Sequence, residues 1–281
     1  MAFASTTQNK NTAIKRRKKN RLYLGIFLIV LLVAILFAVS VVVSRMDQFQ
    51  IKDVVISGNT VTDGTLIEDV VRSGMKDTYF WMFPKSNSFL FPEKAITSEM
   101  LSEFARVERV ELVRTNLSTL AVNITERKPK ALWCEGLKPF LTGTSIADCY
   151  FLDASGLIFS RAPDFSRNVF VRYLGEISAT TTIGGVYGDG HFPEYDFFVQ
   201  SLVAEHLPVT DLIVHKDGNR ELYLSSGVKI LFDNRQDLSV VLTNIKLIIE
   251  KDELSLLSVT PRFEYVDLRY GNKVFYKNRQ N

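Results

Sequence analysis

Histidine and cysteine are scarce in this chain, whose 281 residues include 3 His and 2 Cys. The histidines, His191, His206 and His215, form neither an i, i+4 pair nor the His-Glu-x-x-His pattern of a helical zinc site. Cys134 and Cys149 have no histidine close in sequence, so they do not complete a four-ligand zinc site. We therefore predict neither a metal site nor a cofactor.

Motifs of catalysis are also lacking. The sequence contains no Gly-x-Ser-x-Gly elbow, no Walker motif and no Gly-x-Gly-x-x-Gly fingerprint. The Gly-rich run GGVYGDGH, residues 184–191, lacks the strand and helix of a phosphate-binding loop, so we interpret it as a turn. Asp153 and Asp267 lie in expected hairpins, where acids cap turns or pair with a neighbour such as Arg269. We expect a protein that is not an enzyme.

Acidic residues are absent from residues 1–21, which hold seven basic ones. The run LYLGIFLIVLLVAILFAVSVVV, residues 22–43, follows without a single charge. As a helix it would be roughly 33 Å long, enough to cross a bilayer. Its exit, SRMDQF, does not look like a signal-peptide cleavage site. We predict an uncleaved transmembrane helix over 22–43, preceded by a basic cytoplasmic tail over 1–21.

Positive charge sets the expected orientation of this span. Only Arg45 and Lys52 follow it closely, mixed with Asp47 and Asp53. The positive-inside rule places the N-terminus in the cytoplasm and the rest of the chain outside, as in a single-pass type II protein of the cell membrane. The net charge is +3 for the chain and +7 for the tail, which leaves −4 for the remainder. A nucleic-acid partner is therefore not indicated, because its binding needs positive charge on a folded face.

An oxidising location outside the cytoplasm makes a disulfide between the two cysteines plausible. The segment between them contains Gly136, Pro139 and Gly143, so it can turn back on itself. We predict a Cys134–Cys149 bridge. Two free thiols are the alternative.

Residues 49–128 have the pattern of a small domain with the order strand, helix, helix, strand, strand. Asp63 can cap the first helix and Gly74 can end it. The expected inward residues of the two helices are Leu66, Ile67, Val70 and Val71, and then Ile96, Met100, Leu101 and Phe104. In the two later strands the expected inward residues are Val110, Leu112, Leu120, Val122 and Ile124.

An aromatic loop over residues 79–91 separates the two helices. Its rings include Phe80, Trp81, Phe83 and Phe91. These rings either fold back over the core of the domain or touch the bilayer interface, where aromatic side chains are favoured. The sequence leaves both alternatives open.

Residues 129–277 read as a second domain of short strands with two helices. Strands are expected within ALWC, CYFLD, GLIFS and NVFVRYLG, in the stretch from 211 to 233 and in the terminal hairpin. The first helix covers FPEYDFFVQSLVAEHL, with Phe197, Phe198, Leu202 and Val203 inward, and Asp237 starts the second. The fold class is thus α+β, with a mostly antiparallel sheet and helices packed on one face.

This order of elements resembles a POTRA domain, a small module of the bacterial envelope, and four stretches resemble the FtsQ/DivIB cell-division family. VVISGNTVT (54–62) lies where that family has Gly-Asn, and LVRTNLSTLAVNITERKPKALW (112–133) resembles its passage from the POTRA domain into the next domain. CYFLDASGLIF (149–159) resembles its Asp-x-x-Gly hairpin, and FEYVDLRYGNKVFYK (263–277) its terminal DLRY hairpin. The chain departs from the family at Leu117–Leu120, where Pro-x-x-Leu is usual, and in its cysteine pair and long aromatic loop.

The resemblance implies a divisome scaffold at the septum. In that family the POTRA domain is associated with septal recruitment, and the protein recruits and regulates septal peptidoglycan synthesis through two membrane-anchored coiled-coil partners, FtsB and FtsL. One alternative is a POTRA-bearing envelope protein-assembly factor, but such proteins usually carry several POTRA copies or a barrel. A second alternative is an enzyme that acts on the cell wall.

The terminal hairpin is the expected partner-binding site. A two-residue turn at Gly271-Asn272 would place Tyr270 opposite Lys273 and Asp267 opposite Tyr276. Val266, Leu268 and Phe275 would then face the core. The last strand is expected at a sheet edge, which lysines protect or to which a partner adds a strand. The resemblance implies that an FtsB-like protein binds here, and the residues assigned to the site are Tyr265, Tyr270, Lys273, Val274, Phe275 and Tyr276.

Overall fold

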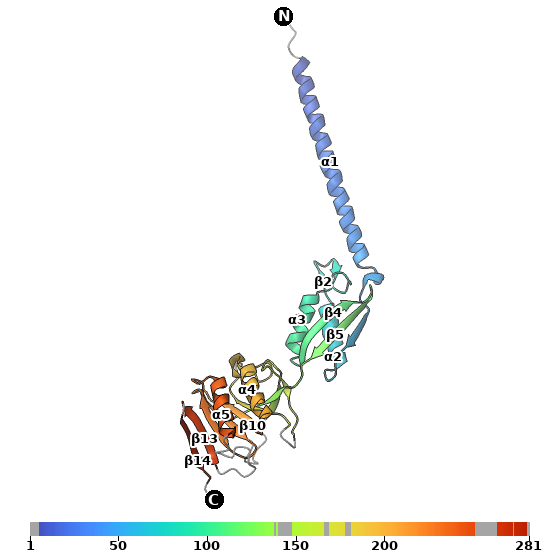
Figure 1. Cartoon of the computed structure of the whole chain (residues 1–281). Coiled ribbons are helices and arrows are strands. Elements are labelled where there is room, and N and C mark those ends of the chain that lie inside the picture. Colours follow the sequence, from blue (N-terminus) through green and yellow to red (C-terminus); the bar gives the residue numbers. More distant parts are fainter. Residues whose placement is uncertain are drawn as a thin grey trace. The chain divides into compact units, whose positions relative to one another are not determined.

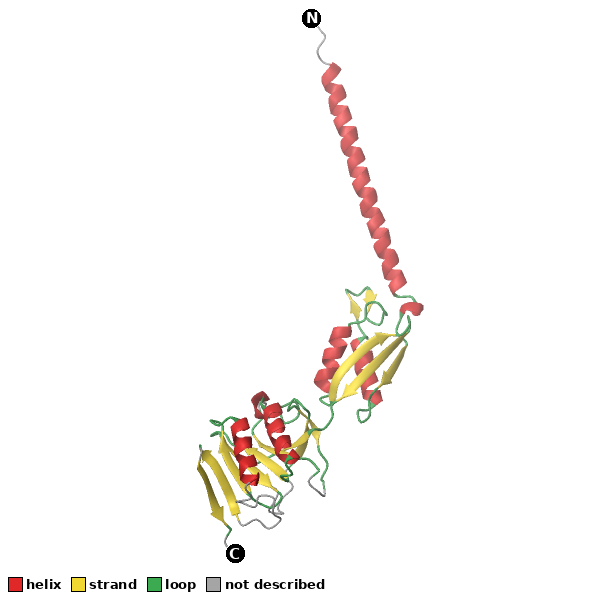
Figure 2. Ribbon diagram, viewed as in Figure 1, coloured by secondary structure: helices red, strands yellow, loops and turns green. Residues whose placement is uncertain are grey.

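The computed structural model describes residues 6–137, 139, 148–165, 169–177, 181–250, 263–271 and 273–279, with backbone alone for 6–18. The described residues form two compact units, the first comprising 1–102 and 109–124 and the second comprising 103–108 and 125–281. The secondary-structure elements of both units appear in Figures 1 and 2. Each unit has its own sheet and its own buried core.

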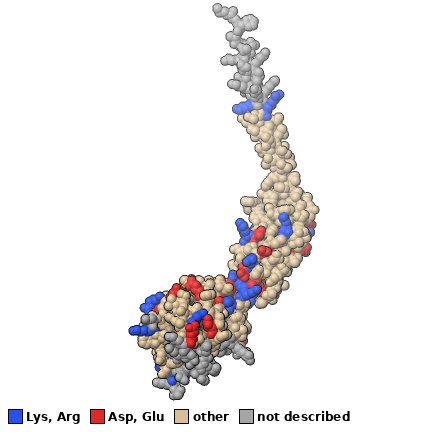
Figure 3. All heavy atoms as spheres, viewed as in Figure 1, with Lys and Arg blue, Asp and Glu red and all other residues tan. Residues whose placement is uncertain are grey.

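A long apolar helix, α1 (Thr6–Ser44), begins the first unit. Among the described residues, Lys19–Ser44 is the one stretch of helix long and apolar enough to cross a membrane. Most side chains between Lys19 and Val43 are exposed, and Figure 3 shows a continuous uncharged surface beyond the basic residues near the start of this stretch. An apolar helix that is exposed all round needs a non-aqueous surrounding, because no polar face is available to water.

The rest of the first unit is a three-stranded sheet with two helices, as the described residues show. The elements are β1 (Asp53–Ser57), α2 (Gly64–Gly74), α3 (Glu93–Glu103), β4 (Val107–Arg114) and β5 (Thr119–Glu126), with a small hairpin of β2 (Thr78–Tyr79) and β3 (Phe83–Pro84) between the helices. The strand order is β1-β5-β4, and β1 runs parallel to β5. The expected order of strand, helix, helix, strand, strand is confirmed.

The cap and the strand pattern of the first unit form as predicted, whereas the helix faces do so only in part. The Asp63 carboxylate accepts a hydrogen bond from the Thr65 amide at 2.9 Å and so caps α2. The predicted inward residues of β4 and β5 are all buried. The buried face of each helix is narrower than predicted. Leu66 and Leu101 are exposed, whereas the predicted residues Ile67, Val70, Val71, Ile96 and Met100 are buried. Leu66 precedes buried Ile67 and Leu101 follows buried Met100, so each lies about 100° around its helix from a buried neighbour and points away from the core.

The rings of the aromatic loop differ in burial. Phe83 and Phe91 are half-buried, but Phe80 and Trp81 leave 80% and 89% of their surface exposed. Phe80 and Trp81 form the tip of the β2–β3 hairpin. The alternative in which the rings fold back over the core is therefore wrong for these two residues.

The second unit contains a nine-stranded sheet, counted over its described residues. In chain order its strands are β6 (Ala131–Cys134), β7 (Cys149–Leu152), β8 (Ile158–Arg161), β9 (Arg172–Gly175), β10 (Val209–Val214), β11 (Asn219–Leu224), β12 (Lys229–Asp233), β13 (Phe263–Tyr270) and β14 (Lys273–Asn278). In space they follow the order β14-β13-β12-β11-β10-β9-β6-β7-β8. Pairs β6–β9, β9–β10 and β12–β13 are parallel and the others antiparallel, so the mostly antiparallel α+β prediction is confirmed.

Helices α4 (Phe192–Ala204) and α5 (Leu238–Glu250) cover one face of this sheet (Figure 2). They bury a core that includes Phe198, Leu202, Val241 and Ile245 against the strands. Two other predicted inward residues, Phe197 and Val203, are exposed instead. The buried stripe of α4 runs through Phe192, Tyr195, Phe198, Val199 and Leu202, which are spaced i, i+3, i+6, i+7 and i+10 and turn Phe197 and Val203 outward.

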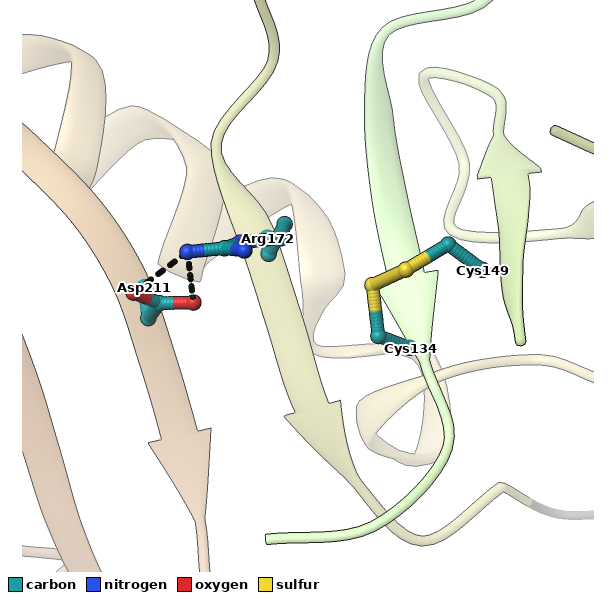
Figure 4. The surroundings of a disulfide bond; sticks show 4 residues. All are labelled: Cys134, Cys149, Arg172 and Asp211. Carbon is teal, nitrogen blue, oxygen red and sulfur yellow. Dashed lines mark hydrogen bonds and ion pairs between the residues drawn. A yellow bond between two sulfur atoms is a disulfide. The ribbon is translucent and has the colours of Figure 1, made fainter. Parts of the chain in front are cut away.

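The opposite face of the sheet carries the predicted disulfide. Cys134 of β6 lies directly opposite Cys149 of β7, and the two are bonded, so the bridge is confirmed and the alternative of two free thiols is wrong. Figure 4 shows a buried ion pair on neighbouring strands of the same sheet, in which Arg172 donates to Asp211 at 2.8–2.9 Å. These groups extend a small apolar cluster that contains Leu132, Leu174 and Ile213.

Candidate partner-binding edge of the second sheet

The last strand lies at the edge of the nine-stranded sheet, as predicted. Within the described residues β14 pairs on one side only, with β13, and Figure 1 shows it outermost among the red strands. Every residue of β14 is exposed. Its outer backbone groups therefore have no strand of this sheet to bind, and they can accept an added strand.

The register of the hairpin differs from the predicted one by one residue. Tyr270 lies opposite Lys273 as expected, but Asp267 lies opposite Phe275 rather than Tyr276, and Val266 lies opposite Tyr276. The register shifts between Asp267 and Tyr270, where β13 has one more residue than β14. Such a bulge adds one residue to one strand and exchanges the faces of the residues beyond it.

The bulge decides which aromatic ring lies on which face. The prediction that Phe275 faces the core is wrong. The Phe275 side chain is 50% exposed and meets the Tyr270 ring edge to face, with centroids 5.1 Å apart. Tyr276 shares the face of buried Val266 and meets the Phe263 ring at 4.9 Å. Exposed aromatic side chains therefore stand on both faces of the edge.

A network around Asp267 holds the bulge in place. Arg269 donates from Nε and Nη2 to the two carboxylate oxygens of Asp267, at 2.9 and 2.7 Å, and from Nη1 to Asn219 at 3.0 Å. Burial raises the pKa of Asp267, but the hydrogen bonds and charge of Arg269 outweigh burial and hold that pKa below its usual value. Gln236 also donates to the Leu268 carbonyl at 2.8 Å. The Asp-Leu-Arg part of the DLRY motif is thus structural, while Tyr270 remains 58% exposed.

The structure brings together all six residues that were assigned to the site. Tyr265 is half-buried, and the other five are exposed, with exposed fractions of 39% for Val274 and 55% for Tyr276. Lys277 pairs with Glu264 of β13 at 2.7 Å, and this contact lowers the pKa of Glu264. The arrangement can supply backbone hydrogen bonds along β14 and aromatic contacts beside them.

Sequence reasoning missed a cleft of about 1000 Å³ in the same unit. It is lined by the end of the Gly-rich run 184–191, the start of α4, Arg220, and the segment that leads into α5. Arg220 stacks on the Tyr195 ring at 5.0 Å, and His191 lies 3.3 Å from Glu194. The lining comes from segments far apart in the sequence, so no spacing between them could have indicated the cleft.

The other candidate residues have local roles. Asp153 accepts hydrogen bonds from the amides of Ser155 and Leu157 and from Arg127, which confirms its predicted role in the turn. The three histidines lie apart, before α4, after it and after β10. No cluster of three or more His, Cys, Asp or Glu that could hold a metal occurs among the described side chains.

Comparisons with known proteins leave the family open. No model of a known protein family matches the chain, and a search of curated proteins finds no match. Membership of the FtsQ/DivIB family therefore stays a prediction from the motifs.

Proposed function

We propose that this chain is a membrane-anchored scaffold of bacterial cell division, of the FtsQ/DivIB type, that binds a partner along β14. The observation that carries the proposal is the exposure of β14 along its whole length at the sheet edge, next to the DLRY motif. The first unit would be a POTRA domain associated with recruitment to the septum. The partners would be FtsB-like and FtsL-like proteins with single membrane spans, and through them the chain would regulate septal peptidoglycan synthesis.

The composition of the edge favours docking over protection alone. A protected edge usually carries charge, proline or a short strand. Lys273 and Lys277 provide charge, but the three consecutive residues between 273 and 277 are apolar and exposed. With Tyr270 they give aromatic and aliphatic anchors of the kind that dominate interfaces. An added strand would pair with the backbone and would cover these side chains at the same time.

The proposed location is supported by α1. Its apolar length suits a bilayer, and the basic tail before it favours a cytoplasmic N-terminus. Both folded units would then lie outside the cytoplasm, where a disulfide is stable. This single-pass type II arrangement would present β14 to the extracytoplasmic segments of other single-span division proteins.

The proposal is tested by cross-linking in cells. A photoreactive amino acid at Val274, 39% exposed on β14, should capture a small single-span membrane protein that localises to the septum. The matched control is Val203, 40% exposed on α4, which should not capture that protein. Equal capture from both positions, or capture of no septal membrane protein from Val274, would contradict the proposal.

Binding to the captured partner then tests the geometry. Tyr270→Ala should weaken binding by about 1–3 kcal/mol, as typical interface anchors do. Adjacent residues of a strand direct their N–H groups to opposite sides, so one of Val274→Pro and Phe275→Pro removes a donor from the outer edge. That variant should lose binding while circular dichroism shows an intact fold. Wild-type binding by all three folded variants would mean that β14 is not the docking strand.

A further inference from the structure

The tip of the β2–β3 hairpin is the most exposed aromatic feature of the first unit. Phe80 and Trp81 follow β2, and 80% and 89% of their surfaces are exposed. The turn is closed by a hydrogen bond from the Met82 amide to the Tyr79 carbonyl at 3.0 Å. Contact of large apolar rings with water is unfavourable. Transfer of Phe80 and Trp81 to an apolar or amphipathic surrounding would therefore lower the free energy.

The backbone of the tip is unusual for aromatic residues. Phe80 and Trp81 have φ values of 49° and 60°, in the left-handed region that Gly, Asn and Asp take most readily. A turn of this kind would form more easily with those residues. The chain instead places two of its largest side chains at the tip, which indicates a role for the rings beyond closing the turn.

The hairpin contacts the apolar helix directly. The ring of Phe83 in β3 meets the ring of Phe37 in α1 edge to face, with centroids 5.9 Å apart. Phe37 lies six residues before Val43, so this contact is about 9 Å inside the end of the uncharged run. The hairpin therefore sits beside the part of α1 that a bilayer would enclose.

Arg45 ties the tip to the end of the helix. Its side chain donates from Nε to the Met82 carbonyl at 3.0 Å and from Nη2 to the Trp81 carbonyl at 2.9 Å. Arg45 is the first charged residue after the uncharged run. Guanidinium groups at the end of a span reside at the headgroup level, and Trp is enriched at the same level.

We propose that Phe80 and Trp81 insert into the outer interface of the bilayer that α1 crosses, so that the hairpin is a second membrane anchor. The occupant is the lipid surface, because the exposed side chains of α1 around Phe37 require lipid and the hairpin is continuous with them. The anchor would hold the first unit against the membrane instead of leaving it free on a single connection. This inference depends on α1 as a span and is independent of partner binding at β14.

The full chain in lipid vesicles provides the test, because the sequence contains only 2 Trp. Trp133 is buried in the second unit, where it donates to the Gly175 carbonyl, and supplies a constant background. Lipids brominated on the acyl carbons close to the headgroup should quench most of the Trp81 emission. Trp81→Phe keeps an aromatic ring at the tip and should lose this quenching.

A matched control moves the fluorophore away from the hairpin. Leu66 is 53% exposed and lies in the first turn of α2. This helix follows the end of β1 that points away from α1 in the chain order. In a Trp81→Phe background, Leu66→Trp should add emission that brominated lipids do not quench. Equal quenching of wild type and Trp81→Phe would overturn the proposal. Equal quenching of wild type and of the Trp81→Phe, Leu66→Trp double variant would overturn it too. Loss of Trp81 quenching when a single-span membrane partner is added to the same vesicles would assign the tip to that protein instead of to lipid.

Discussion

Single residues fix the hairpin turns on which the second unit is built. Asp153 accepts from the Ser155 and Leu157 amides, and Arg127 donates to its other oxygen at 2.6 Å. Burial raises the pKa of Asp153, but the hydrogen bond from the Ser155 hydroxyl, together with those from the two amides and Arg127, outweighs burial and leaves the pKa below its usual value. Three residues on, Gly156 has a φ of +88°, and a Cβ there would lie 2.5 Å from the Cβ of Phe192. The Asp-x-x-Gly pattern therefore has a physical basis in turn geometry and close packing.

A pair of glycine substitutions separates these two demands. Gly156→Ala should destabilise the second unit through both the left-handed backbone and the clash with Phe192. Gly184 has nearly the same φ, +89°, but no atom within 4 Å of the added Cβ, so Gly184→Ala reports backbone strain alone. Gly156→Ala should lose about 1–3 kcal/mol more in the free energy of unfolding than Gly184→Ala, the usual cost of overpacking. Denaturant titration of both variants measures the difference, and equal losses would show that the clash is relieved.

At the scale of elements, the edge strand combines protection with exposed apolar surface. Lys273 and Lys277 stand at the two ends of the apolar stretch of β14, and Lys277 is paired with Glu264. The bulge in β13 twists the hairpin locally, which also discourages pairing with another copy. These features oppose pairing with a second copy of the chain and leave apolar side chains of β14 exposed for the partner strand that we propose.

Removing the edge lysines should make this protection visible. We expect Lys273→Thr with Lys277→Thr to cause concentration-dependent self-association of the full chain in detergent, because lysines on an edge oppose pairing with a second edge. The control is Lys94→Thr with Lys216→Thr, which removes the same charge from two exposed positions away from β14. Sedimentation velocity distinguishes the outcomes. If both double variants stay monomeric, the lysines do not protect the edge.

At the scale of the whole molecule, the chain forms two units that pack their cores separately. Each has its own sheet, and the disulfide belongs to the second. Residues 134 and 149 are 15 positions apart, and a loop of that size contributes about 3 kcal/mol in the chain-entropy account. The bridge should therefore stabilise one unit and leave the other unaffected.

Thermal unfolding of the disulfide-free chain tests this separation. Cys134→Ala with Cys149→Ala should lower the melting temperature of the second unit by roughly 6–12 °C. The bridge contributes about 3 kcal/mol, and each kcal/mol shifts the melting temperature of a unit of this size by about 2–4 °C. The transition of the first unit should not move. Calorimetry in detergent resolves the two transitions, and an equal shift of both would mean that the units unfold together.

The sequence by itself determined the features that local patterns encode. The uncharged run, the order of strands and helices, the Asp63 cap and the Cys134–Cys149 bridge are all found as predicted. These features depend on helical or strand periodicity, on hydrogen bonds between near neighbours, or on two cysteines that a short loop can join. Each is therefore readable without knowledge of the remaining chain.

Only the tertiary structure decided how the faces are used. One extra residue in β13 shifts the register, and because side chains alternate along a strand, that residue exchanges the faces of Phe275 and Tyr276. The exposure of Phe197 depends on the position of the sheet against α4, and the contact of Phe83 with Phe37 joins segments 46 residues apart. Such outcomes depend on packing between elements that are far apart in the sequence. A small shift of one element changes which side chains meet, and the local sequence pattern does not specify that shift.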